Sequence, residues 1–216
     1  MARLSLIKTL SHLQEEQRHS DEIELAAVGI AFTRGSITEL SGGAGSGKTS
    51  LSLMLLAEMT RVGEICAVVD ASNSFDPGSA ARAGVELGNM LWVKCGGEME
   101  RSFMAADYLV QAKGFGAVWL SLNGLPQRQL DMVPRAYWYR YRTRIKETPT
   151  LFLVTAENTV AGTASQKPLQ LSRERSVWSG SGRFKLLREF HIGIRSRKQF
   201  NRDPLIVQLK ADHTHV

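Results

Sequence analysis

Apolar positions recur along the chain in two kinds of segment, short continuous runs and longer stretches with helical spacing. The continuous runs predict buried parallel strands, because such strands are covered on both faces. The spacing of three and four residues predicts amphipathic helices. We expect strands at 36–41, 64–70, 90–94, 116–122 and 150–155. We expect helices at 3–17, 47–61, 75–87, 99–113 and 126–147, the last of which Pro134 should kink or break.

The alternation of strands and helices predicts an α/β fold with a mostly parallel central sheet flanked by helices. After Ala156 the pattern changes, because residues 158–167 are polar and contain glycine, which is typical of a loop. Further strands are expected at 169–178, 184–195 and 205–210, as antiparallel strands that extend the same sheet. We therefore predict a single domain over 1–216, with an N-terminal helical segment (1–30), a core (31–156) and a loop with a basic β extension (157–216).

The composition is that of an ordinary globular protein, with 216 residues, 43% hydrophobic and 22% charged. The apolar runs fall short of the roughly 20 residues that a membrane span requires. Lys8, His12 and Glu15 interrupt the N-terminus, so we expect no signal peptide. Cys66 and Cys95 lie in apolar runs and are expected to be reduced core thiols. These features predict a cytoplasmic protein that does not bind membranes.

Positive charge is concentrated near the C-terminus. Residues 173–202 contain nine basic and two acidic residues, whereas the net charge of the whole chain is +6. Such clusters favour polyanions, nucleic acid above all, although a solvated surface explains the charge equally well. Arg195, Arg197 and Lys198 should lie near one turn of the expected hairpin. We identify them as candidate contacts either to single-stranded DNA or to an acidic patch of a protein partner.

A second basic run, 128–146, contains the aromatic sequence Tyr137-Trp138-Tyr139-Arg140-Tyr141. These rings could stack on single-stranded bases or pack against the sheet or a partner subunit. We favour packing.

Residues 42–49 read Gly-Gly-Ala-Gly-Ser-Gly-Lys-Thr and match the P-loop pattern in full. They lie between an expected strand and an expected helix, as the motif requires. The glycines let successive N–H groups point at phosphate oxygens, and the helix N-terminus adds positive potential. Lys48 can neutralise phosphates and Thr49 can bind Mg²⁺ through its hydroxyl. We predict that ATP or ADP with Mg²⁺ binds to Gly42, Gly43, Ala44, Gly45, Ser46, Gly47, Lys48, Thr49 and Ser50.

Hydrolysis requires more than this loop, since a carboxylate at the end of a neighbouring strand must help to organise the metal. The strand at 116–121 ends at Ser121 instead. Asp70 ends the strand before it and could reach the metal, or it could cap the segment that follows. Both interpretations remain open, so Thr49 and Asp70 are the candidate metal ligands and no catalytic residue is assigned.

The P-loop is followed by Val69-Asp-Ala-Ser-Asn-Ser-Phe-Asp-Pro77 and Ala81-Arg-Ala-Gly-Val85, an order that resembles the RecA superfamily. The resemblance implies that Asp76 lies against the adenine. It also shows departures. Ser72 stands where RecA proteins have a catalytic glutamate, Ser121 stands where they have an acidic residue, and Ala156 or Glu157 replaces a glutamine.

A shortened RecA-like core with altered catalytic positions resembles the ImuA family of mutagenesis proteins. Ala161-Gly-Thr-Ala-Ser165 and the basic segment Arg195-Ser-Arg-Lys198 are also similar to that family. The resemblance implies an adaptor in DNA-damage tolerance and translesion mutagenesis, beside RecA and the error-prone polymerase machinery, with weak or no ATP hydrolysis. The alternative is an active DNA-dependent ATPase of the RecA recombinase type.

Overall fold

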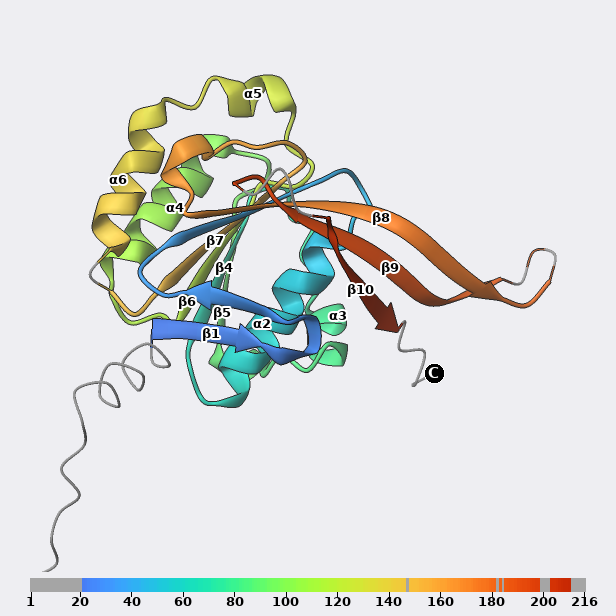
Figure 1. Cartoon of the computed structure of the whole chain (residues 1–216). Helices are drawn as coiled ribbons and strands as arrows, with labels where there is room; N and C mark the ends of the chain where they lie inside the picture. Colours follow the sequence, from blue (N-terminus) through green and yellow to red (C-terminus); the bar gives the residue numbers. More distant parts are fainter. Residues whose placement is uncertain (1–20, 147, 182, 184, 199–202, 211–216) are drawn as a thin grey trace, which may run out of the picture.

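The computed structural model describes residues 21–210 except 147, 182, 184 and 199–202 (Figure 1). Within these residues, eight strands form one sheet in the order β10-β9-β8-β3-β7-β6-β4-β5. The strands are β3 (Ile37–Ser41), β4 (Cys66–Asp70), β5 (Met90–Lys94), β6 (Ala117–Ser121), β7 (Leu151–Ala156), β8 (Lys167–Ser179), β9 (Leu186–Ser196) and β10 (Leu205–Lys210). The expected α/β fold with a mostly parallel central sheet is confirmed.

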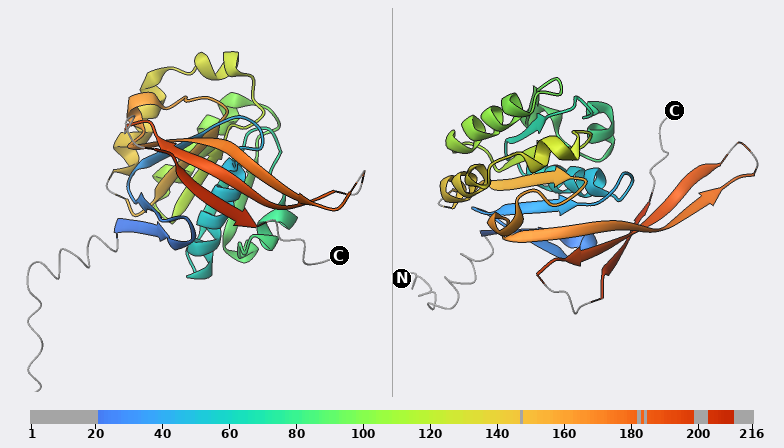
Figure 2. Two further views of the ribbon diagram at one scale, coloured as in Figure 1. Left: turned by 45° about the vertical axis from the view of Figure 1, so that its right-hand side comes forward. Right: turned by 90° about the horizontal axis from the view of Figure 1, so that it is seen from above.

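The pairing changes direction at the hairpin formed by β8 and β9. Strands β5, β4, β6, β7, β3 and β8 pair in parallel. Strand β9 pairs antiparallel to both β8 and β10. The expected antiparallel extension is therefore present, although β8 itself joins β3 in parallel. Figure 2 shows that the paired ends of β8 and β9 project beyond the rest of the sheet.

Helices cover both faces of the sheet. They are α2 (Lys48–Arg61), α3 (Pro77–Arg82), α4 (Met99–Gln111), α5 (Gln127–Asp131) and α6 (Arg135–Ile145). One buried cluster joins the apolar side of α2 to the sheet, and a second joins α4 and α6 to its opposite face. Strands β3, β4, β6 and β7 lie between these clusters and are fully buried. The continuous apolar runs of β4, β6 and β7 predict this burial, whereas β3 buries polar residues as well.

Several expected boundaries change. The helix expected at 126–147 divides into α5 and α6, with Pro134 immediately before α6, because proline cannot donate the backbone bond that a helix interior needs. The helix expected at 75–87 shortens to α3, followed by Gly84 with φ +92°. The helix expected at 3–17 lies outside the described residues.

A pair of strands before the core was not predicted. Strands β1 (Glu22–Leu25) and β2 (Ile30–Thr33) form an antiparallel sheet, where the sequence analysis assigned 1–30 to a helical segment. Their inward residues join the α2 cluster. Each strand is only four residues long, and this explains why alternation gave a weak signal.

Candidate functional site

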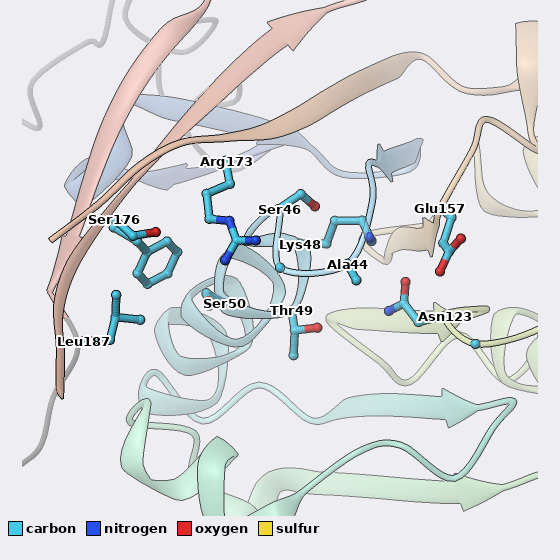
Figure 3. Close-up of a pocket in the computed structure, with 14 residues that line it drawn as sticks. Ala44, Ser46, Lys48, Thr49, Ser50, Asn123, Glu157, Arg173, Ser176 and Leu187 are labelled. Carbon is cyan, nitrogen blue, oxygen red and sulfur yellow. The ribbon is translucent and has the colours of Figure 1, made fainter. Parts of the chain in front are cut away.

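The P-loop joins β3 to α2 at the carboxyl edge of the parallel strands. It opens into a pocket of about 500 Å³ (Figure 3). The pocket is lined by residues 44–50, by Asn123 and Gly124 after β6, by Glu157 after β7, and by the hairpin residues Arg173, Ser176, Leu187 and Phe190. Four separate segments of the chain therefore meet at the predicted phosphate loop.

The start of α2 is built to receive an anion. Gly47 precedes the helix with φ +92°, and no side chain caps the first turn. The N–H groups of that turn have no partner within the helix, and the helix dipole adds positive potential. Thr49 and Ser50 line the pocket beside these groups. This geometry suits a phosphate group and agrees with the loop's predicted role.

Lys48 lines the pocket, and its ammonium group points back toward the backbone of the loop. Its Nζ donates to the carbonyl oxygen of Gly42 and, at 3.0 Å, to that of Gly43. Burial lowers the pKa of Lys48, and the negative charge of Glu157 opposes this shift. The Lys48 cation is thus held by neutral carbonyl oxygens. Charged phosphate oxygens would bind it more strongly than these carbonyls do.

Two glycines of the loop are required by the hairpin that packs on it. A Cβ at Gly42 would lie 2.3 Å from the carbonyl oxygen of Leu171. A Cβ at Gly47 would lie 2.7 Å from Cγ2 of Ile192. The glycines of the motif therefore serve two purposes here, since they shape the phosphate loop and let β8 and β9 approach it closely.

The structure places Asp70 outside the pocket lining. Its carboxylate accepts hydrogen bonds from the backbone N–H of Ser74 at 3.0 Å and of Phe75 at 2.8 Å, and from Nε1 of Trp92 at 3.3 Å. Asp70 is fully buried in this arrangement. Of the two interpretations of Asp70, the geometry matches the capping role, because its oxygens are engaged in the loop after β4.

Three other residues of the pocket carry side-chain oxygen atoms that could bind Mg²⁺. Thr49 is one, Asn123 is the second and the Glu157 carboxylate is the third. The backbone N–H of Gly42 donates to the carbonyl oxygen of Glu157 at 2.9 Å, which fixes Glu157 beside the loop. Such hard oxygen donors, completed by phosphate oxygens, fit Mg²⁺. In the described part of the chain, no group of three His, Cys, Asp or Glu side chains forms a metal site of its own.

The end of β6 carries an amide network where the RecA resemblance implies an acidic residue. Nδ2 of Asn123 donates to Oγ of Ser121 at 3.3 Å and to Oγ1 of Thr155 at 3.0 Å. Oδ1 of Asn123 and Oγ of Ser46 are buried, and neither has a hydrogen-bond partner among the described residues. Unpaired buried oxygens are costly, so their presence in two pocket residues is consistent with a ligand-binding site.

Asp76 is the N-cap of α3 and does not line the P-loop pocket. Its carboxylate accepts from the backbone N–H of Gly78 at 3.1 Å and of Ser79 at 2.9 Å. The pKa of Asp76 is lowered most by the hydrogen bond from the hydroxyl of Ser79, and the two backbone bonds lower it further. Its implied contact with adenine remains a prediction.

The basic turn after β9 holds the loop that follows β7. Nη1 of Arg197 donates to Oγ1 of Thr159, and Nζ of Lys198 donates to the carbonyl oxygen of Gln166 at 2.8 Å. Arg195 is exposed and has no hydrogen bond or ion pair with any residue that the structure describes. The three predicted contact residues therefore differ, because Arg197 and Lys198 bond to the loop after β7 and the side chain of Arg195 does not; its contact with DNA or a partner remains a prediction.

Part of the aromatic run on α6 packs inside the protein, as the favoured interpretation predicted. Trp138 and Tyr141 are buried against Phe103 of α4. Arg140 and Arg144 pair with Asp107.

Sequence reasoning missed the hairpin wall of the pocket. Arg173 was counted only as part of the basic excess, and Ser176 and Phe190 were not singled out. Successive side chains of a strand point to opposite faces, so the expected strand could have shown that Arg173 shares a face with Leu169 and Leu171. The register that brings that face over the P-loop required the structure.

Comparison with known proteins places this geometry in a family. The model of the RecA N-terminal domain family matches residues 9–121, slightly more than half of the 216 residues. Protein RecA of Borrelia duttonii (strain Ly) is 35% identical over 108 residues, which are 49% of this chain and 30% of that protein. Protein RecA of Chlorobaculum parvum is 44% identical over 66 residues, which are 30% of this chain and 19% of that protein. The alignments thus span less than a third of these relatives.

Proposed function

The chain belongs to the RecA N-terminal domain family, and from this premise we propose that it is a nucleotide-binding adaptor of DNA-damage tolerance with weak or no ATP hydrolysis. One observation carries the proposal. The phosphate-binding half of the pocket is intact, whereas the carboxylates that the resemblance implies at Ser72 and Ser121 are missing and Asp70 caps a loop.

The pocket residues divide into distinct tasks. The N–H groups of the P-loop and the ammonium of Lys48 would bind the phosphates, and the hydroxyl of Thr49 would hold Mg²⁺. A bound nucleotide with Mg²⁺ supplies the phosphate oxygens that complete the metal's shell. These residues bind and orient the nucleotide, but Ser72 and Ser121 offer no carboxylate to activate a water.

The ImuA resemblance supports the cellular role. It implies contacts with RecA and with the error-prone polymerase machinery in the cytoplasm, and single-stranded DNA is a further candidate partner. Arg195, near the end of β9, is better placed for either than Arg197 or Lys198, because its side chain is exposed and unpaired among the described residues. In the described part of the chain, no helix is long and apolar enough to span a membrane.

A second candidate, an active DNA-dependent ATPase, is favoured by Glu157. Its carboxylate lines the pocket beside the loop, on the same side as Asn123. A carboxylate at that position could act as a general base for a water. Glu157 therefore has to be tested separately from the binding residues.

Isothermal calorimetry with Mg²⁺-ATP tests the proposal when it is paired with a phosphate-release assay with and without single-stranded DNA. We expect binding in the wild type that Lys48→Ala removes and that the surface control Arg128→Ala retains. We expect phosphate release at the level of Lys48→Ala in every case. Absence of binding in the wild type would refute the nucleotide site. Release above that level that is lost in Glu157→Gln would establish the ATPase instead.

A further inference from the structure

The hairpin of β8 and β9 turns one face toward the P-loop. Residues directly opposite each other in an antiparallel pair point to the same side of the sheet. Leu171 pairs with Ile194, and Arg173 pairs with Ile192. Leu171, Ile192 and Ile194 are buried in the cluster that includes α2. Arg173 therefore continues a row of core-facing residues, although its own side chain reaches solvent.

A β-bulge directs this row toward the pocket. The register shifts between Arg173 and Arg175, so that Arg175 pairs with His191 and Ser176 pairs with Phe190. The extra residue places Ser176 on the same face of the hairpin as Arg173. Without the bulge, regular alternation would have placed Arg175 on that face instead. Both line the pocket, and Arg175 does not. Bulges often re-aim a side chain in this way next to a functional site.

The guanidinium of Arg173 lies directly over the loop. A Cβ at Gly45 would lie 3.4 Å from both Cζ and Nη1 of Arg173. Figure 3 shows the guanidinium above the loop between Ser46 and Ser50. The side chain of Arg173 has no hydrogen bond or ion pair within the described residues. The guanidinium therefore lies at the loop with no carboxylate bound to it in the described part of the chain.

A polyanion bound in the pocket would give this guanidinium a partner. The Arg guanidinium offers five donors in a planar fork that matches phosphate oxygens, and it stays charged at all working pH values. It lies on the side of the pocket where α2 begins, whereas Glu157 and Asn123 lie on the other side. The two sides therefore differ in charge, positive at Arg173 and negative at Glu157.

We propose that Arg173 binds the phosphates of the nucleotide from the same chain that provides the P-loop, so that β8 forms the second wall of the site. This inference rests on the proposed function, because it assumes that the loop binds a nucleotide. It adds that one copy of the chain supplies two cations to the phosphates, Lys48 from the loop and Arg173 from the hairpin.

Calorimetry with two probes, ADP and inorganic pyrophosphate, each with Mg²⁺, tests the assignment. Arg173→Gln should weaken both probes by about 10-fold or more, the effect of losing one charge-assisted hydrogen bond. Arg173→Lys should retain part of the affinity, since it keeps the charge and loses the fork. Arg175→Gln is the matched control, because it removes an arginine from the opposite face of the same strand, and its affinity should be unchanged.

The outcomes separate this inference from the proposed function. If the wild type binds neither probe, both fail. If the wild type binds and Arg173→Gln binds equally well, only the role of Arg173 is refuted. A loss for ADP without a loss for pyrophosphate would contradict a phosphate contact. A loss of single-stranded DNA binding with unchanged ADP binding would assign Arg173 to DNA and also overturn the inference. Equal melting temperatures of Arg173→Gln and the wild type establish that the variant is folded.

Discussion

Glu39 shows how a single buried residue links the core to the loop after β7. It lies in β3 and is fully buried. Its Oε1 accepts hydrogen bonds from the backbone N–H groups of Val160 and Ala161, the latter at 2.9 Å. Burial raises the pKa of Glu39, while these two bonds and the charge of Arg197 oppose the shift. Compared with the unfolded chain, the folded protein therefore favours the neutral acid.

The pH dependence of stability follows from this direction. Because the folded state holds the proton more tightly than the unfolded chain, the contribution of Glu39 to stability is largest below its unfolded pKa. It is lost as the pH rises through the folded pKa. Glu39→Gln imitates the neutral acid. Its free energy of unfolding should therefore fall less than that of the wild type when the pH rises from 4 to 8. Urea titrations at the two pH values measure this, and equal losses in both proteins would contradict the account.

Glu39→Ala separates charge from hydrogen bonding. It leaves the N–H groups of Val160 and Ala161 without their acceptor, so we expect a loss of about 1–3 kcal/mol in the free energy of unfolding.

At the scale of elements, the basic turn after β9 and the loop after β7 form one unit. Arg197 and Lys198 bond to Thr159 and to the carbonyl oxygen of Gln166. The same loop begins with Glu157, which lines the pocket. The turn therefore supports one wall of the site from a distance.

Hydrogen exchange can detect this support. Replacing Arg197 and Lys198 together by alanine should speed amide exchange in 158–166 by about 30-fold, because two bonds are lost and each is worth about 1 kcal/mol. Arg195→Ala should leave exchange in this loop unchanged, since its side chain has no bond there in the described structure. Unchanged exchange in the double variant would show that the loop is held by Glu39 and the sheet alone.

Sequence patterns predicted those elements whose signal is local. Continuous apolar runs predicted the parallel strands β4, β6 and β7, and Pro134 marked the start of α6. The P-loop was recognisable because its glycines, Lys48 and Thr49 are adjacent in sequence. The wall formed by Arg173 was not, since its position depends on a bulge and on the pairing with Ile192. Asp70 allowed two roles because capping and metal binding require the same carboxylate.

The whole molecule combines a P-loop with a pocket that contains charged residues of both signs. Two cations, Lys48 and Arg173, face the loop, and Glu157 is the one carboxylate in the pocket lining of the described structure. These residues come from three elements that the sheet brings together, the start of α2, strand β8 and the loop after β7, whose ribbons can be followed in Figure 1. Under the proposed function, such a site would hold a nucleotide without hydrolysing it, because two cations are available to bind phosphate and one carboxylate is available to activate water.

A single-turnover experiment measures this claim most directly. The protein is mixed in excess with γ-labelled ATP and Mg²⁺, with and without single-stranded DNA, and the bound label is separated and identified over time. We predict that the label is retained by the wild type, is not retained by Lys48→Ala, and is recovered as intact ATP. Recovery of the label as free phosphate, faster than with Lys48→Ala, would contradict the account and identify the protein as an active ATPase.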